Sequence, residues 1–99
     1  MTEKFKIEKI ILEELNNIIK EMGEEIYFNL GGPQEQNICL EKIDDLWYVY
    51  FVERGMKHRI QDFETLYAAS INVIDRLSET NEIYEEYKGK FENILRRKW

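Results

Sequence analysis

The side chains that most often carry catalysis are few in this chain and lie apart in sequence. His58 is the only histidine, and it lies between Lys57 and Arg59 in a predicted edge strand, an exposed position that does not favour a general base. Cys39 is the only cysteine, and no histidine that could activate its thiol is near in sequence. One histidine and one cysteine also supply too few of the ligands that zinc prefers. We therefore expect a surface histidine, a passive thiol and no metal site.

Two short motifs remain as candidates for phosphate binding or proton transfer. Gly31-Gly32-Pro33 is rich in glycine, but it lacks the lysine, the hydroxyl residue and the helix start of a phosphate-binding loop. Asp44 and Asp45 are adjacent at a predicted loop tip, where water would screen both carboxylates and catalytic use is not expected. The sequence therefore predicts no catalytic residue and no cofactor, and it favours a binding protein over an enzyme.

The composition is that of one small folded domain. The chain has 99 residues, of which 43% are hydrophobic and 34% charged, which fits a single core within residues 1–99. A lone cysteine cannot form an intrachain disulfide, which favours a cytoplasmic location. The charged start of the chain is unlike a signal peptide, and no run approaches the roughly 18 apolar residues that cross a bilayer. We expect no membrane association.

The chain is acidic, with 14 Lys and Arg against 20 Asp and Glu and a formal net charge of −6. Such a charge opposes binding to nucleic acid and suits a basic partner. Between residues 34 and 45 the acids Glu35, Glu41, Asp44 and Asp45 outnumber a single base, Lys42. An exposed acidic loop there would steer association with a basic partner. The alternative is an ordinary solvated turn.

Hydrophobic periodicity predicts an α+β fold. Apolar residues at helical spacing run from Phe5 to Met22 and stop at Gly23, a residue that commonly ends helices. Alternating and β-branched runs follow, and two more helical stripes complete the chain. We predict an antiparallel four-stranded meander packed against helices, in the order αββββαα. The expected strands are 25–30, 38–43, 46–53 and 56–60. The second helix is expected at 63–77, with Asp62 as its N-cap, and the last helix should begin near Glu82.

The second and third strands should form a hairpin around Asp44 and Asp45. With a two-residue loop, facing residues have numbers that sum to 89, whereas a longer loop would shift the register by one. This register places an apolar set toward the core and a tyrosine-bearing set on the other face. The core set is Ile38, Leu40, Lys42, Trp47, Val49 and Phe51, and the second set is Cys39, Glu41, Ile43, Leu46, Tyr48 and Tyr50.

The second face is a candidate binding surface because tyrosine combines a large rigid ring with a hydroxyl and is enriched at interfaces. Tyr27 joins Tyr48 and Tyr50 on it if the first strand also turns its apolar residues to the core. Alternatively, the last helix, with Tyr84, Tyr87 and Phe91, covers this face and completes a three-layer domain.

The stretch from Trp47 to Gly55, followed by Phe63 and the helical pair Ala68 and Ala69, resembles small bacterial immunity proteins. These are the single-domain antitoxins of polymorphic-toxin and contact-dependent inhibition systems, and the nearest likeness is to the TriTu-like group. The resemblance spans Leu46–Leu77. It implies tight stoichiometric binding of a cognate toxin, often through an acidic surface when that toxin is a nuclease. It supplies no site residues, because no fixed binding motif can be matched to these positions.

Two functional hypotheses follow. The first is a cytoplasmic immunity protein that occludes a toxin domain with the acidic hairpin region and the tyrosine face. The second is a structural or adaptor module that homodimerises, or docks on another protein, through the same face. Under either hypothesis the chain is a monomer or a homodimer that binds protein, with no nucleic acid and no membrane.

Overall fold

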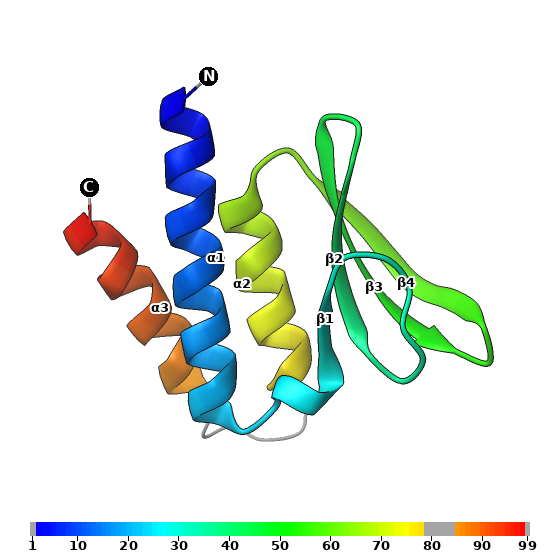
Figure 1. The fold of residues 1–99 in the computed structure, drawn as a ribbon. Helices are drawn as coiled ribbons and strands as arrows, with labels where there is room; N and C mark the ends of the chain where they lie inside the picture. The colour runs from blue at the N-terminus through cyan, green and yellow to red at the C-terminus, as the bar shows by residue number, and fades with distance from the viewer. Residues whose placement is uncertain (1, 79–84, 99) are drawn as a thin grey trace.

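The computed structural model describes residues 2–78 and 85–98, with side chains described for 6–78 and 86–97 (Figure 1). Helix α1 (Thr2–Met22) confirms the first helical stripe and begins three residues before the expected Phe5. Ile11, Leu15 and Ile18 on this stripe are buried. The expected stop is also confirmed, because Gly23 takes φ +74° and its N–H donates to the Lys20 carbonyl at 3.0 Å.

The sheet contains four strands in the spatial order β1-β2-β3-β4. Their bounds are β1 (Phe28–Leu30), β2 (Ile38–Ile43), β3 (Leu46–Glu53) and β4 (Met56–Phe63). The α+β prediction is confirmed, but the fully antiparallel meander is wrong. Strands β2, β3 and β4 are antiparallel, whereas β1 runs parallel to β2.

The parallel pairing arises from the path of residues 31–37, which we call the crossing loop. Gly31, with φ +122°, turns the chain out of β1, and the loop then passes across the sheet and returns to the end at which β1 began (Figure 1). Strand β2 therefore starts beside the start of β1, with Phe28 opposite Ile38. A tight turn at Gly31-Gly32-Pro33 would instead have reversed the chain.

The first strand is also shorter than its alternating pattern suggests. Glu25–Tyr27 forms a short 3-10 turn, η1, closed by a 2.9 Å hydrogen bond from the Tyr27 N–H to the Glu24 carbonyl. This turn carries the chain from the end of α1 to the sheet edge. Ile26 and Tyr27 are consequently 71% and 50% exposed and do not share a sheet face with Tyr48.

The β2–β3 hairpin confirms the predicted register, with pairs from Ile38 opposite Phe51 to Ile43 opposite Leu46. Asp44 takes a positive φ of 57° in the turn, as the first residue of a primed hairpin turn does. Leu40, Trp47 and Val49 lie in the main core as expected. The face assignment of these two strands therefore holds.

Strand β4 extends to Phe63, three residues beyond the expected end. Asp62 pairs with Tyr48 and Phe63 with Trp47, so the ladder continues where a helix cap was expected. The actual N-cap of α2 (Leu66–Leu77) is Thr65, whose side chain accepts a 3.2 Å hydrogen bond from the Ala68 N–H. The assignment of Asp62 as N-cap is therefore wrong.

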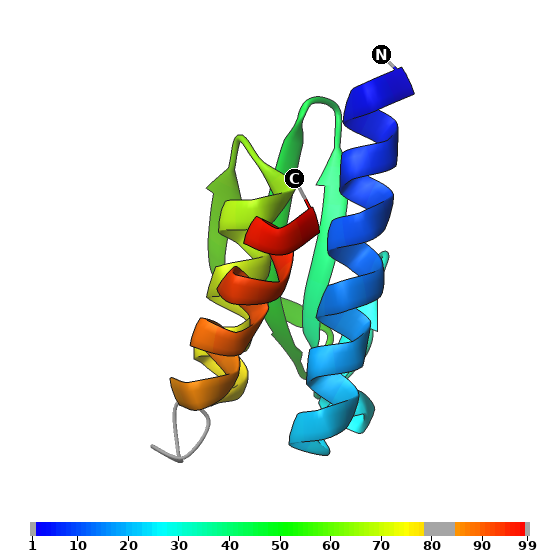
Figure 2. The same cartoon turned by 90° about the vertical axis from the view of Figure 1, so that its left-hand side faces the viewer.

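The three helices lie on one side of the sheet. Helix α2 lies nearest to the strands, and α1 lies beside it (Figure 1). Helix α3 (Glu85–Lys98) packs against α1 and α2 on the side away from the sheet (Figure 2), where Phe91 and Leu95 enter the core. The last helix does not cover the tyrosine face. Its expected start near Glu82 lies outside the described residues.

Among residues 2–78 and 85–98, none of the helices combines the length and the apolar character needed to cross a bilayer.

Candidate functional site

The sheet face that points away from the helices divides into two halves. One half is a small buried cluster of Cys39, Tyr50 and Val52, and the crossing loop passes over it (Figure 1). The other half lies toward the Asp44-Asp45 turn and carries no such cover. This division decides which of the expected binding residues are accessible.

The crossing loop is hydrogen-bonded to the end of β3. The Gln36 N–H donates to the Val52 carbonyl at 2.8 Å, and the Val52 N–H donates to the Asn37 carbonyl at 3.2 Å. The Glu35 carboxylate accepts hydrogen bonds from the backbone N–H of Arg54 and, at 3.0 Å, from that of Gly55. Glu35 thus holds the β3–β4 turn, at the opposite end of β3 from Asp44 and Asp45.

Tyr50 and Glu41 bind each other beneath this loop. The Tyr50 hydroxyl donates a 2.7 Å hydrogen bond to Glu41 Oε1. Lys57 Nζ lies 4.0 Å from the same oxygen and 4.6 Å from the centre of the Tyr50 ring. Burial raises the pKa of Tyr50, and the hydrogen bond to Glu41 raises it further. Both side chains therefore make internal contacts that help to order the sheet.

Cys39 is fully buried in the covered half, with Sγ 3.7 Å from the Asn37 carbonyl and 3.9 Å from that of Gln34. Burial is the main reason that the pKa of its thiol is raised. A thiol that resists ionisation is a poor nucleophile. A passive, partly buried thiol was expected, and Cys39 is buried completely.

The open half combines apolar side chains with carboxylates, and we call it the hairpin-end surface. Tyr48 lies at its centre and is opposite Asp62 in the ladder. Ile43 and Ile60 are 40% and 53% exposed. The alternation of side chains along β2, β3 and β4 places these residues on one face. The hairpin-end surface comprises Ile43, Asp44, Asp45, Leu46, Tyr48, Ile60 and Asp62.

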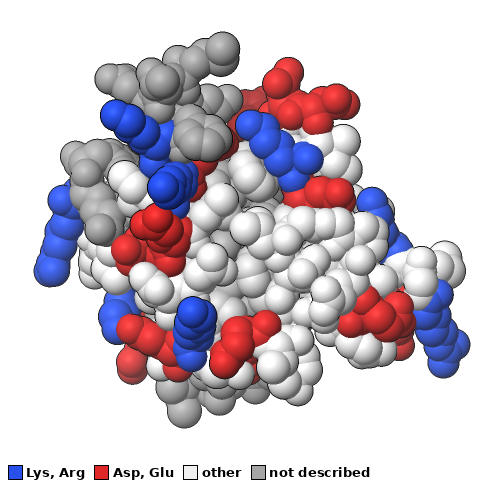
Figure 3. All heavy atoms as spheres, viewed as in Figure 1, with Lys and Arg blue, Asp and Glu red and all other residues white. Residues whose placement is uncertain are grey.

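Three carboxylates border this surface. Asp44, Asp45 and Asp62 are exposed, and none of them forms an ion pair with another residue that the structure describes. Acidic side chains also gather in Figure 3 at the end of the molecule where the β2–β3 turn lies. Their charge is therefore available to an external cation.

The structure brings only some of the predicted binding residues together. Asp44, Asp45 and Tyr48 share the hairpin-end surface, whereas Tyr27 is exposed on η1, away from it. Sequence reasoning missed Ile60 and Asp62 and ended the fourth strand at Ile60. Continuing the strand would not have found them, because plain alternation from the Arg54-Gly55 turn points both residues toward the core. The bulge between the Val49 and Phe51 pairs shifts the register and brings Asp62 opposite Tyr48.

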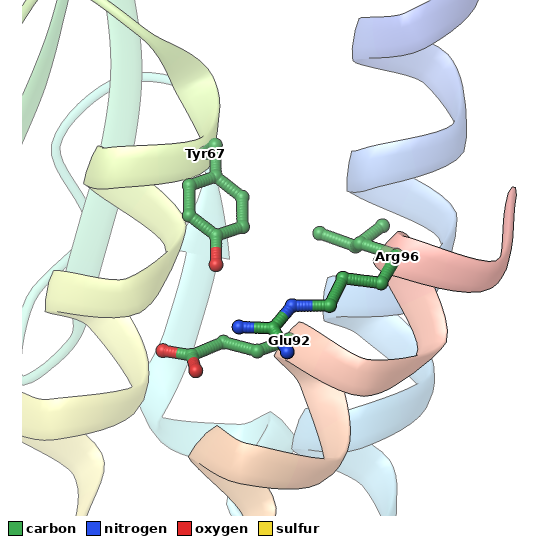
Figure 4. A pocket seen from close by; sticks show the side chains of 4 residues that line it. Tyr67, Glu92 and Arg96 are labelled. Atoms are coloured by element: carbon green, nitrogen blue, oxygen red, sulfur yellow. The ribbon is translucent and has the colours of Figure 1, made fainter. Parts of the chain in front are cut away.

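A separate notch lies between α2 and α3, where Tyr67, Glu92, Leu95 and Arg96 line a cavity of about 220 Å³. The Tyr67 hydroxyl points toward the Glu92 and Arg96 side chains (Figure 4). Burial raises the pKa of Tyr67, and the charge of Glu92 adds to the effect. The cavity is smaller than the ~300–1,000 Å³ usual for small-molecule sites. Within the described part of the chain, no three His, Cys, Asp or Glu side chains are grouped to hold a metal ion.

Comparison of the chain with family models, curated proteins and solved structures finds no match. The resemblance over Leu46–Leu77 therefore stays a prediction, and the function must be argued from the geometry of the surface.

Proposed function

We propose that this chain is an immunity protein that binds and neutralises a cognate toxin domain by stoichiometric contact, in the cytoplasm of the cell that makes it. The observation that carries the proposal is the hairpin-end surface, where an uncovered apolar strip around Tyr48 adjoins Asp44, Asp45 and Asp62. An apolar centre with a polar rim is the usual anatomy of a protein interface.

The charge of the surface selects a basic partner. Three carboxylates that form no ion pair with another described residue lie on a chain whose net charge is −6. Both the local and the overall field therefore attract a cation-rich protein. Basic surfaces are typical of nucleases because these enzymes bind phosphate backbones. A nuclease domain is therefore the toxin class that this surface suits best.

The alternative is a homodimer or an adaptor that uses the same surface. A two-fold interface places identical patches against each other. Two copies of this acidic surface would place carboxylates of both chains in one interface, and like charges there are unfavourable. A dimer by light scattering that buries Tyr48 would favour this alternative.

The proposal requires that the gene upstream of this one encode a protein with a toxin-like C-terminal domain, and the test uses that domain. Co-expression of the chain should rescue cells from that domain, and the purified proteins should form a 1:1 complex. The variant Asp44→Lys with Asp45→Lys should rescue poorly. The matched control Glu13→Lys with Glu86→Lys changes the same charge at exposed sites on α1 and α3 and should rescue fully. Failure of the unaltered chain to rescue or to bind would overturn the proposal.

A further inference from the structure

Along half of one edge, β2 has no neighbouring strand among residues 2–78 and 85–98. β1 pairs with β2 only from Phe28 opposite Ile38 to Leu30 opposite Leu40, while β2 continues to Ile43. The last backbone contact on this side is the 2.9 Å hydrogen bond from the Gly31 N–H to the Leu40 carbonyl. Backbone groups on one side of a strand recur every second residue. The N–H and C=O of Lys42 therefore point to the same edge, where β1 has already turned away.

A groove lies beside this open edge, between the first half of α1 and the core face of the β2–β3 hairpin. It encloses about 500 Å³, and its lining is mainly apolar. The residues that line it are Glu8, Lys9, Leu12, Lys42 and Trp47.

The polar side chains of the groove are already ordered. Trp47 Nε1 donates a 3.1 Å hydrogen bond to Glu8 Oε2. Lys42 Nζ lies 3.7 Å from Glu8 Oε1 and 5.6 Å from the centre of the Trp47 ring. Glu8 therefore neutralises one cation, while Lys9 is exposed and forms no ion pair with another described residue. The groove carries an excess positive charge on an acidic chain.

We propose that this slot binds an extended acidic segment of another protein, added as a strand along the open edge of β2. The free stretch from Glu41 to Ile43 covers about 10 Å, enough for three residues of the segment. Side chains two residues apart in a strand share a face. The segment would thus place an apolar side chain against Leu12 and Trp47, and a carboxylate two residues away near Lys9.

The other sheet edge shows how this protein protects a strand that is not used for pairing. β4 has a bulge in its ladder, and Arg59 within it takes a positive φ of 54°. Lys57 and His58 precede it, and charges and bulges of this kind discourage strand addition. The described pairings of β2 show no bulge. It also differs from the hairpin-end surface, because that surface lies on the opposite sheet face and attracts cations.

The test titrates isotopically labelled protein with a synthetic octapeptide that is N-acetylated and C-amidated. The peptide has glutamate and phenylalanine two residues apart in a threonine background, and a matched peptide has lysine in place of glutamate. We expect saturable NMR shifts at the Lys42 amide and the Trp47 indole N–H with the glutamate peptide, and at least about tenfold weaker binding of the lysine peptide. Shifts that instead map to Tyr48, or equal binding of both peptides, would overturn the inference.

Two further variants separate strand addition from loose groove binding. In one peptide a methyl group replaces the hydrogen of the backbone N–H that pairs with Lys42, and binding should weaken about tenfold. In a second peptide the methyl group is on the next nitrogen, which points away from β2, and binding should change little. Lys9→Glu should weaken the glutamate peptide, while Lys20→Glu, the same charge change at the other end of α1, should not. Equal effects of the two methylated peptides, or of the two lysine variants, would also overturn it.

Discussion

Replacing Tyr50 by phenylalanine removes one oxygen from the covered half of the sheet and leaves the ring in place. The hydroxyl is buried and donates a 2.7 Å hydrogen bond to Glu41 Oε1. A hydrogen bond to a charged group contributes ~1.5–3 kcal/mol. The Glu41 side chain is 25% exposed, so water can partly replace the lost donor, which favours the lower end. We expect Tyr50→Phe to lower the free energy of unfolding by about 1.5 kcal/mol.

Tyr48→Phe is the matched control, because Tyr48 points from the same strand to the same sheet face but lies in the open half. Its hydroxyl has no hydrogen-bond partner among the described residues. Urea unfolding followed by circular dichroism measures both variants. With a slope of roughly 1.5 kcal/mol per molar urea, Tyr50→Phe should move the midpoint down by about 1 M, and Tyr48→Phe should leave it within about 0.3 M.

Equal midpoints for the two variants would refute this account of the outer face. They would mean that the crossing loop does not bury Tyr50 and that both tyrosines are open to solvent. A larger loss for Tyr48→Phe would mean that the open and covered halves are assigned the wrong way round.

Three other outcomes follow from the same contacts. Trp47→Ala should cost about 3–5 kcal/mol in urea unfolding because Trp47 is only 7% exposed, and a variant of unchanged stability would contradict its place in the core. Burial raises the pKa of Tyr50 and of Cys39, so both side chains ionise at a lower pH in the unfolded chain than in the folded one. The free energy of unfolding should therefore fall as the pH rises through their ordinary pKa values of 10.0 and 9.0. Tyr50→Phe should make this fall less steep, and an unchanged slope would contradict the burial of Tyr50. Asp44→Lys with Asp45→Lys should cost about 1 kcal/mol or less, mainly because lysine fits the positive φ of residue 44 less well than aspartate. It should slow association with the toxin domain about tenfold at low salt, and an unchanged association rate would exclude steering by this turn.

The hairpin was predictable from sequence because its register depends on local residues. Asp44 and Asp45 set the turn, and alternation then fixes which side chains share a face. The direction of β1 was not predictable in this way. It depends on the crossing loop, which is held by hydrogen bonds from Arg54 and Gly55 to Glu35, about twenty residues away in sequence.

The candidate site was predicted in part for the same reason. Asp44, Asp45 and Tyr48 belong to the hairpin itself and were found together. Asp62 was missed because an aspartate before an apolar helical stripe fits an N-cap pattern, yet the ladder with β3 continues and Thr65 caps the helix. Tertiary pairing decided between two local patterns that were both physically acceptable.

The most direct test of the proposed function is hydroxyl-radical footprinting of the chain, free and in complex with the upstream toxin domain. Tyr48 is half-buried and should be protected on binding, whereas Tyr27 and Tyr67, at 50% and 36% exposure, should be oxidised to the same extent in both states. Unchanged oxidation of Tyr48 with protection of Tyr27 or Tyr67 would contradict binding through the hairpin-end surface.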